Sequence, residues 1–164
     1  MSNIPAQTQI VNEIELRLKN ITKENGYFST LAKIKRAHLQ PFQSTDLPCI
    51  NYWPNYDNLV QQLSGAELRE FTVSVEFYDK NNERPLSDKA AELASDVKIA
   101  LWRSKNEPKT SDKPNQKLGN LVDSFAITSI EPVLGEGPSP FCGVVVTITI
   151  QYRTSDNNPF LIKQ

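Results

Sequence analysis

The chain has 164 residues, 38% of them hydrophobic and 23% charged, and its net charge of −1 gives no general attraction to nucleic acid or anionic lipid. This length suits one domain with its own core. No apolar run approaches the ~20 residues that span a bilayer. No basic region followed by an apolar stretch opens the sequence, so we expect neither a membrane segment nor a secretory signal.

The first expected element is an amphipathic helix over residues 5–24. Its apolar residues recur at spacings of three and four and form one stripe: Ile10, Ile14, Leu18 and Ile21. Pro5 suits the first turn, and Gly26 is a good stop after the last. The charged residues between them, Arg17 included, are expected on the other faces. Such a helix needs an apolar surface, which we expect to be a sheet.

Two short strands are expected next, over residues 32–39 and 47–54. Charged residues in the first suit a sheet edge, and prolines confine the second to an edge or to strand ends. The polar residues 55–66 are predicted to be a loop. Beside it lies an aromatic cluster: Tyr52, Trp53 and Tyr56. Partly exposed aromatics of this kind anchor protein interfaces, and packing in the core is equally compatible with their sequence.

Alternation of apolar and polar residues predicts two long strands, over residues 67–78 and 144–152. Between them, residues 86–102 are expected to form a second amphipathic helix, with Ser87 as its N-cap. A strand over residues 124–133 is expected to form a hairpin with the last strand. The expected fold is therefore α+β: a two-layer domain with a mostly antiparallel β-sheet of four to five strands and two main helices packed on one face.

Residues 104–121 are predicted to be an extended polar loop, since residues 104–117 contain no apolar side chain other than prolines. Two acidic residues in this loop are outnumbered by four lysines: Lys105, Lys109, Lys113 and Lys117. Residues 1–154 are expected to form a single domain, and residues 155–164 a C-terminal tail. The tail is polar with an apolar end made by Phe160, Leu161 and Ile162.

No set of residues resembles a catalytic or metal site. His38 stands in a polar stretch without a carboxylate nearby, so we expect it at the surface or on an edge strand. Cys49 and Cys142 lie in apolar surroundings and are expected to be buried thiols, and with one histidine they cannot complete a Cys/His zinc site. Gly135-Glu136-Gly137 leads to Pro138, which donates no backbone N–H, so we expect a turn there. We expect no enzyme activity, no cofactor and no metal.

Several segments, taken in order, carry a family resemblance over residues 8–154. They are the first helix leading to Gly26-Tyr27-Phe28, then Leu47-Pro48-Cys49-Ile50, the strand Phe71–Phe77 ending in Tyr78-Asp79, the helix 86–102, and a last strand ending Ile150-Gln151-Tyr152-Arg153-Thr154. This pattern resembles the tail terminator, or tail completion, proteins of tailed bacteriophages. The loop 104–121 and the tail are particular to this chain.

The resemblance implies a structural virion protein that forms a hexameric ring on the tail tube, ends tube polymerisation and offers the joining surface to the head. It implies assembly in the host cytoplasm and a place in the phage tail or neck. The implied partners are further copies of the chain, the tail tube protein, the head-completion or neck protein, and the sheath if the tail is contractile. DNA would pass nonspecifically through the lumen, and no membrane partner is expected.

Position alone suggests which residues contact partners. The loop lysines would reach a neighbouring subunit, the tube or the lumen, and the apolar end of the tail would dock on a partner or an adjacent subunit. Two other interpretations stay open: another head-tail connector, neck or minor tail protein, and a non-viral cytosolic adaptor domain that binds proteins. A ring in solution favours assembly, whereas a monomer or dimer favours the adaptor.

Overall fold

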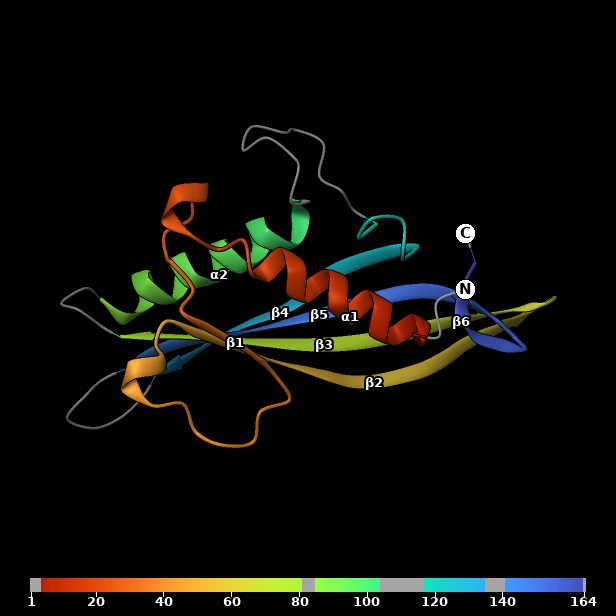
Figure 1. The fold of residues 1–164 in the computed structure, drawn as a ribbon, viewed down its shortest axis with the longest axis horizontal. Coiled ribbons are helices and arrows are strands. Elements are labelled where there is room, and N and C mark those ends of the chain that lie inside the picture. The colour runs from red at the N-terminus through yellow and green to blue at the C-terminus, as the bar shows by residue number, and fades with distance from the viewer. Residues whose placement is uncertain (1–3, 81–84, 104–116, 135–140, 164) are drawn as a thin grey trace.

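The α+β fold expected from the sequence is confirmed in a computed structural model, which describes residues 4–80, 85–103, 117–134 and 141–163. Two α-helices pack on one face of a curled, mostly antiparallel sheet (Figure 1). The elements are α1 (Ala6–Leu18), β1 (Lys33–Arg36), β2 (Cys49–Leu63), β3 (Ala66–Lys80), α2 (Leu86–Trp102), β4 (Ser124–Leu134), β5 (Phe141–Ser155) and β6 (Asn158–Ile162). Short 3₁₀ turns lie at Lys23–Asn25 and Ser44–Asp46.

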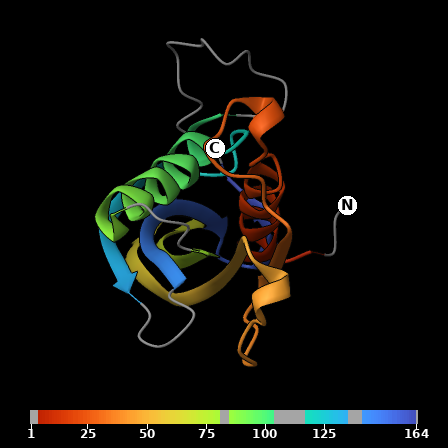
Figure 2. The ribbon, with the colours of Figure 1, turned by 90° about the vertical axis from the view of Figure 1, so that its left-hand side faces the viewer.

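The sheet has the strand order β1-β2-β3-β5-β4, and β6 pairs with β5. β1 runs parallel to β2, and the other pairs are antiparallel. β3 lies along one side of β5 as far as Thr154, so β6, which also pairs at Thr154, continues the side that β4 occupies. Viewed nearly along its strands, the sheet is strongly curled, with both helices outside it (Figure 2).

The alternation in the long strands produces the core. In β3 the odd-numbered residues from Phe71 to Phe77 are fully buried, while those between them are half-buried. In β5 the even-numbered residues from Val144 to Ile150 are likewise buried, and those between them are half-buried. The helices complete the core with their apolar stripes: Ile10, Ile14 and Leu18 from α1, and Leu93, Val97 and Leu101 from α2.

α1 is shorter than the sequence predicts. It ends at Leu18, and a 3₁₀ turn at Lys23–Asn25 follows, closed by Gly26 at φ 84°. Ile21 is fully buried although it lies outside the helix. The apolar spacing therefore predicts its burial correctly but not its secondary structure. α2 has the expected bounds, but its N-cap is Pro85 and not Ser87.

Residues 55–66 do not form the predicted loop. β2 continues to Leu63, pairs with β3 as far as Ala66, and turns through Gly65 at φ 73°, a conformation that glycine adopts without strain. Most side chains from Asn55 to Gln62 are exposed. A strand that is wet on both faces has the polar composition of a loop, which explains the error.

The C-terminal segment is not a free tail. Asn158–Ile162 form β6, so the sheet gains a strand beyond residue 154. The side-chain Nε2 of Gln9 in α1 donates to the Phe160 carbonyl at 3.0 Å, and Lys163 Nζ donates to the Gly65 carbonyl. These bonds hold β6 between α1 and the β2–β3 turn.

Two buried charges join α2 to the N-terminal region. Arg17 is buried, contrary to expectation, because its guanidinium donates to the Leu101 carbonyl at 2.7 Å and to Glu13 at 2.8 Å. Asp96 is completely buried and accepts hydrogen bonds from the backbone N–H groups of Phe28 and Ser29, at 2.8 and 2.9 Å. The carboxylate of Asp96 therefore fixes the chain just after Gly26 against α2.

We predict that Asp96→Ala lowers the free energy of unfolding by about 2–4 kcal/mol, because the buried N–H of Ser29 and the part-buried N–H of Phe28 lose their acceptor. Urea unfolding followed by circular dichroism measures the change. Lys98→Ala, at an exposed position on the same helix, is the control and should change stability by less than about 0.5 kcal/mol. Equal effects of the two substitutions would contradict the role assigned to Asp96.

Glu15 ties α1 to the β1–β2 side of the sheet. Its carboxylate accepts a hydrogen bond from the Tyr52 hydroxyl and lies 2.7 Å from Lys19 Nζ and 3.2 Å from Arg36 Nη2. Partial burial opposes the charged form, but the hydrogen bonds from Lys19 and Tyr52 outweigh it and lower the pKa of Glu15. Burial and the bond to Glu15 raise the pKa of Tyr52 to about 12, so Tyr52 stays a neutral donor.

A lowered pKa means that ionised Glu15 stabilises the fold above its ordinary value of 4.5, and that this contribution is lost as the pH falls through the lower folded-state value. We therefore expect Glu15→Gln to lower Tm at pH 7, with a much smaller difference from the unmodified protein at pH 3. Thermal unfolding at the two pH values checks this. Glu131→Gln, at an exposed site on β4, should show no such pH-dependent difference; an equal Glu15→Gln effect at both pH values would disprove the argument.

Candidate functional site

The described residues contain no site for a metal ion. Within these ranges, no three His, Cys, Asp or Glu side chains gather closely enough to hold one. None of the helices seen there has the length and apolar character needed to cross a membrane. Cys49 and Cys142 are buried free thiols, as predicted, and burial raises the pKa of Cys49 to about 12.

Two edges of the sheet lack a neighbouring strand in the part of the chain that the structure describes. β1 pairs with β2 only as far as Tyr52, which leaves β2 from Trp53 to Leu63 as an edge. β4 forms the opposite edge. Exposed apolar side chains lie on both strands: Tyr56 (75% exposed), Leu59 and Val60 (51% each) on β2, and Ile130 (49%) on β4. Unpaired edges of this kind are templates for another chain.

The aromatic cluster divides among three environments. Tyr52 is completely buried, so the core alternative holds for this residue. Trp53 points to the other face of β2, where its partly buried side chain lines a groove in the sheet. Tyr56 is exposed on the open part of β2, where it is available to a partner. The structure therefore does not bring the three rings together as one anchor.

The groove, with a volume of about 570 Å³, lies on the sheet face opposite the helices. Its floor comes from β2, β3, β5 and β4, and residues 38–47 form one wall. Asn51, which is 3% exposed, holds this wall by bonding both backbone groups of His38, at 3.0 and 3.1 Å. His38 is partly buried directly after β1, and its ring lies 5.3 Å from that of Phe42. It therefore lies beyond the strand, in the wall of the groove, and neither on an edge strand nor fully at the surface as expected, because Asn51 binds its backbone.

A glycine shapes the floor of the groove. The Tyr78 ring lies directly over Gly143 of β5, where a Cβ would come within 2.8 Å of Tyr78 Cε1 and 3.1 Å of the Phe77 carbonyl oxygen. Tyr78 also meets Phe141 edge to face, with ring centroids 5.9 Å apart. Burial, and then the charge and hydrogen bond of Glu76, raise the pKa of Tyr78 to about 12.

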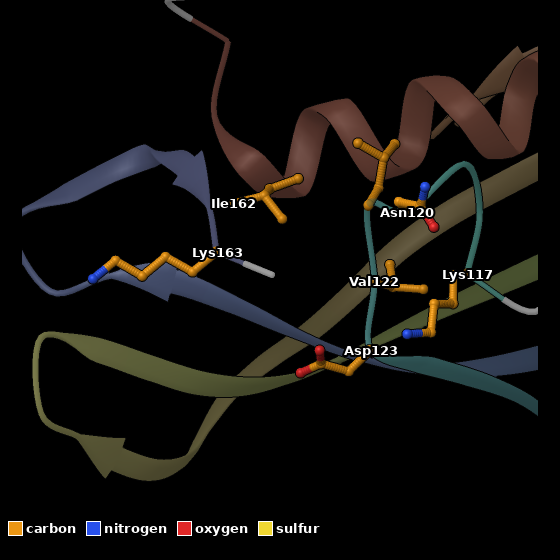
Figure 3. Close-up of a pocket in the computed structure, with 7 residues that line it drawn as sticks. Lys117, Asn120, Val122, Asp123, Ile162 and Lys163 are labelled. Carbon is orange, nitrogen blue, oxygen red and sulfur yellow. The ribbon is translucent and has the colours of Figure 1, made fainter.

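A second, smaller pocket of about 90 Å³ lies between β6 and the turn at residues 117–123 (Figure 3). It brings together two predicted contact residues, Lys117 and Ile162. Ile162 packs on the core, whereas Phe160 and Leu161 are 41% and 50% exposed. The Lys163 side chain points away from the pocket (Figure 3).

The predicted polar loop is described only at its end. Leu118 is completely buried, so residues 117–121 are anchored to the core and are not the polar excursion that the sequence predicts. Lys105, Lys109 and Lys113 lie outside the described residues, as do Gly135-Glu136-Gly137 and the rest of the predicted turn. Lys117 is exposed at the rim of the small pocket.

Sequence reasoning misses the groove. Glu76 is recognisable from the alternation as a residue on the polar face, but its neighbour Asn51 is brought to it by the β2–β3 register. Comparison with known proteins gives no further guide: no protein-family model and no curated protein matches this chain. Its function is therefore argued from the sequence pattern and from the geometry of the edges and the groove.

We predict that Gly143→Ala destabilises the protein by about 1–3 kcal/mol, because the new methyl group forces the Tyr78 ring off the floor of the groove. Urea unfolding measures the loss. The same substitution in a Tyr78→Ala background should cost clearly less, since the clashing ring is gone. An equal cost in both backgrounds would show that the ring is not the cause.

Proposed function

We propose that this chain is a structural assembly protein whose copies form a ring, and that the ring caps a phage tail tube, ends its polymerisation and joins it to the head or neck. The observation that supports assembly most is the presence of two open strand edges on opposite sides of one sheet. The phage-specific part of the proposal is supported by the sequence resemblance over residues 8–154.

Opposite edges favour a head-to-tail interface. The open part of β2 in one copy can lie beside β4 in the next, so the unpaired backbone groups of both edges gain partners. Each copy contacts one neighbour through β2 and the other neighbour through β4. Repetition of this interface closes into a ring when the rotation between successive copies allows it. Tyr56, Leu59 and Val60 on one strand, with Ile130 on the other, supply apolar area to bury.

One end of the molecule offers a surface for a different partner. The β2–β3 turn and β6 lie together at this end, where Lys163 donates to Gly65 and where Phe160 and Leu161 are exposed (Figure 1). These two exposed apolar side chains at the end of the strands suit contact with a ring above or below, such as the tube or the neck. Lysines of the loop would meet passing DNA through nonspecific phosphate contacts.

The first experiment is the mass of the purified protein across concentration, by light scattering after size exclusion, with negative-stain imaging of the peak. The proposal expects a ring, about six times the 18.5 kDa chain mass. A chain that stays monomeric both alone and with tail tube protein would overturn the tail-terminator proposal. That result would favour the adaptor alternative.

A charge placed on the open part of β2 should prevent assembly. We expect Leu59→Lys to shift the ring to monomer, because a lysine at the edge opposes strand pairing. Leu16→Lys is the matched control, since Leu16 is a similarly exposed leucine on α1 (55% against 51%) and lies on neither edge. Light scattering at matched concentration measures the mass of both variants. A ring that survives Leu59→Lys, or that is lost equally with Leu16→Lys, would exclude the β2 edge as the interface.

A further inference from the structure

The groove contains a carboxylate that no basic side chain neutralises within the described residues. Glu76 receives a 3.4 Å hydrogen bond from Asn51 Nδ2 and a hydrogen bond with the Tyr78 side chain, and both partners are neutral. Other acidic residues nearby are paired: Asp46 lies 2.6 Å from Lys33 Nζ, and Asp79 lies 2.7 Å from Lys89 Nζ. Glu76 therefore gives the groove a negative charge that no cation of the described residues balances.

Several aromatic side chains line the same groove as this carboxylate. Trp53 lies next to Asn51 on the same face of β2, and Tyr78 lies next to Glu76 on the same face of β3. Phe141 contacts Tyr78, and Phe42 contributes from the wall. The indole Nε1 of Trp53 is buried and has no hydrogen-bond acceptor among the described residues. The groove thus offers flat apolar faces and one negative charge.

We propose that this groove binds an arginine side chain presented by a partner protein. The guanidinium would lie against the Glu76 carboxylate and stack on the Trp53 and Tyr78 rings. Arginine fits better than lysine because its planar, weakly hydrated cation both stacks on aromatic faces and pairs with carboxylates. This site goes beyond ring assembly, since it recognises a side chain of a different protein and shares only Trp53 and Val133 with the open part of β2 and with β4.

Other occupants fit the chemistry less well. A purely apolar segment would cover the carboxylate without neutralising it, which costs free energy. An anion would be repelled by Glu76. A bare divalent cation needs several oxygen ligands, whereas among the described residues Glu76 is the only one that lines the groove with a carboxylate.

The test is a titration of the ¹⁵N-labelled full chain with the peptide acetyl-Ala-Arg-Ala-amide, followed by NMR. The chain has two tryptophans, so its spectrum has two indole signals, and Trp53→Phe assigns them. We expect the Trp53 signal to move on binding, while that of Trp102, which packs on Phe125 at a centroid distance of 4.7 Å, stays in place. The matched peptide with citrulline, which keeps the shape of arginine without the charge, should bind about tenfold more weakly.

Glu76→Gln separates charge recognition from shape. It should weaken binding of the arginine peptide about tenfold and bring it level with the citrulline peptide, while Glu70→Gln, on the same face of the same strand, should leave binding unchanged. The dispersion of the amide signals shows whether each variant is folded. Equal binding of the two peptides to the unmodified chain, unchanged binding in Glu76→Gln, or an unmoved Trp53 signal would each overturn the proposal. None of these outcomes depends on whether the chain forms rings.

Discussion

The β3–β5 ladder is the constraint on which the rest of the molecule depends. It runs from Glu67 opposite Thr154 to Lys80 opposite Phe141 without a register shift, whereas the β2–β3 pair contains two and the β4–β5 and β5–β6 pairs contain one each. A slip of one residue would turn every core side chain of one strand toward water. This register therefore decides which face receives the helices and which face is left to form the groove.

The sequence predicts the elements that obey one simple period. Alternation identifies β3, β4 and β5, and the helical stripe identifies α2 with its bounds, because in each of these elements one side is buried and the apolar residues mark that side. Sequence reasoning fails for elements in which no side is buried in this way. Residues 55–63 form a strand that is mostly exposed, and the pairing of β6 with β5 depends on a neighbour that the local sequence does not reveal. Arg17 is buried because α2 ends beside it, which no helical stripe reports.

The candidate sites were less accessible to sequence reasoning than the fold. Exposure of Tyr56 and burial of Tyr52 follow from where β1 stops, and the groove requires four separate segments to meet: residues 38–47, Asn51 of β2, Glu76 of β3 and Gly143 of β5. The groove lies on one face of the sheet and shares only Trp53 and Val133 with the open part of β2 and with β4, so self-association and capture of a partner use largely different residues. One scaffold can then serve as both a repeating unit and a point of attachment.

The hydrogen bond from Gln9 to the Phe160 carbonyl has a topological consequence. It brings the beginning of α1 beside β6. Because Gln9 Nε2 also donates to the Ile4 carbonyl at 2.8 Å, Ile4 and Phe160, near the two ends of the described chain, lie close together. A short linker between them would close the backbone into a circle, which could be reopened at another exposed turn without disturbing the sheet. For the same reason, a fusion partner attached at either terminus would emerge beside the β2–β3 turn and leave the opposite end of the molecule unobstructed.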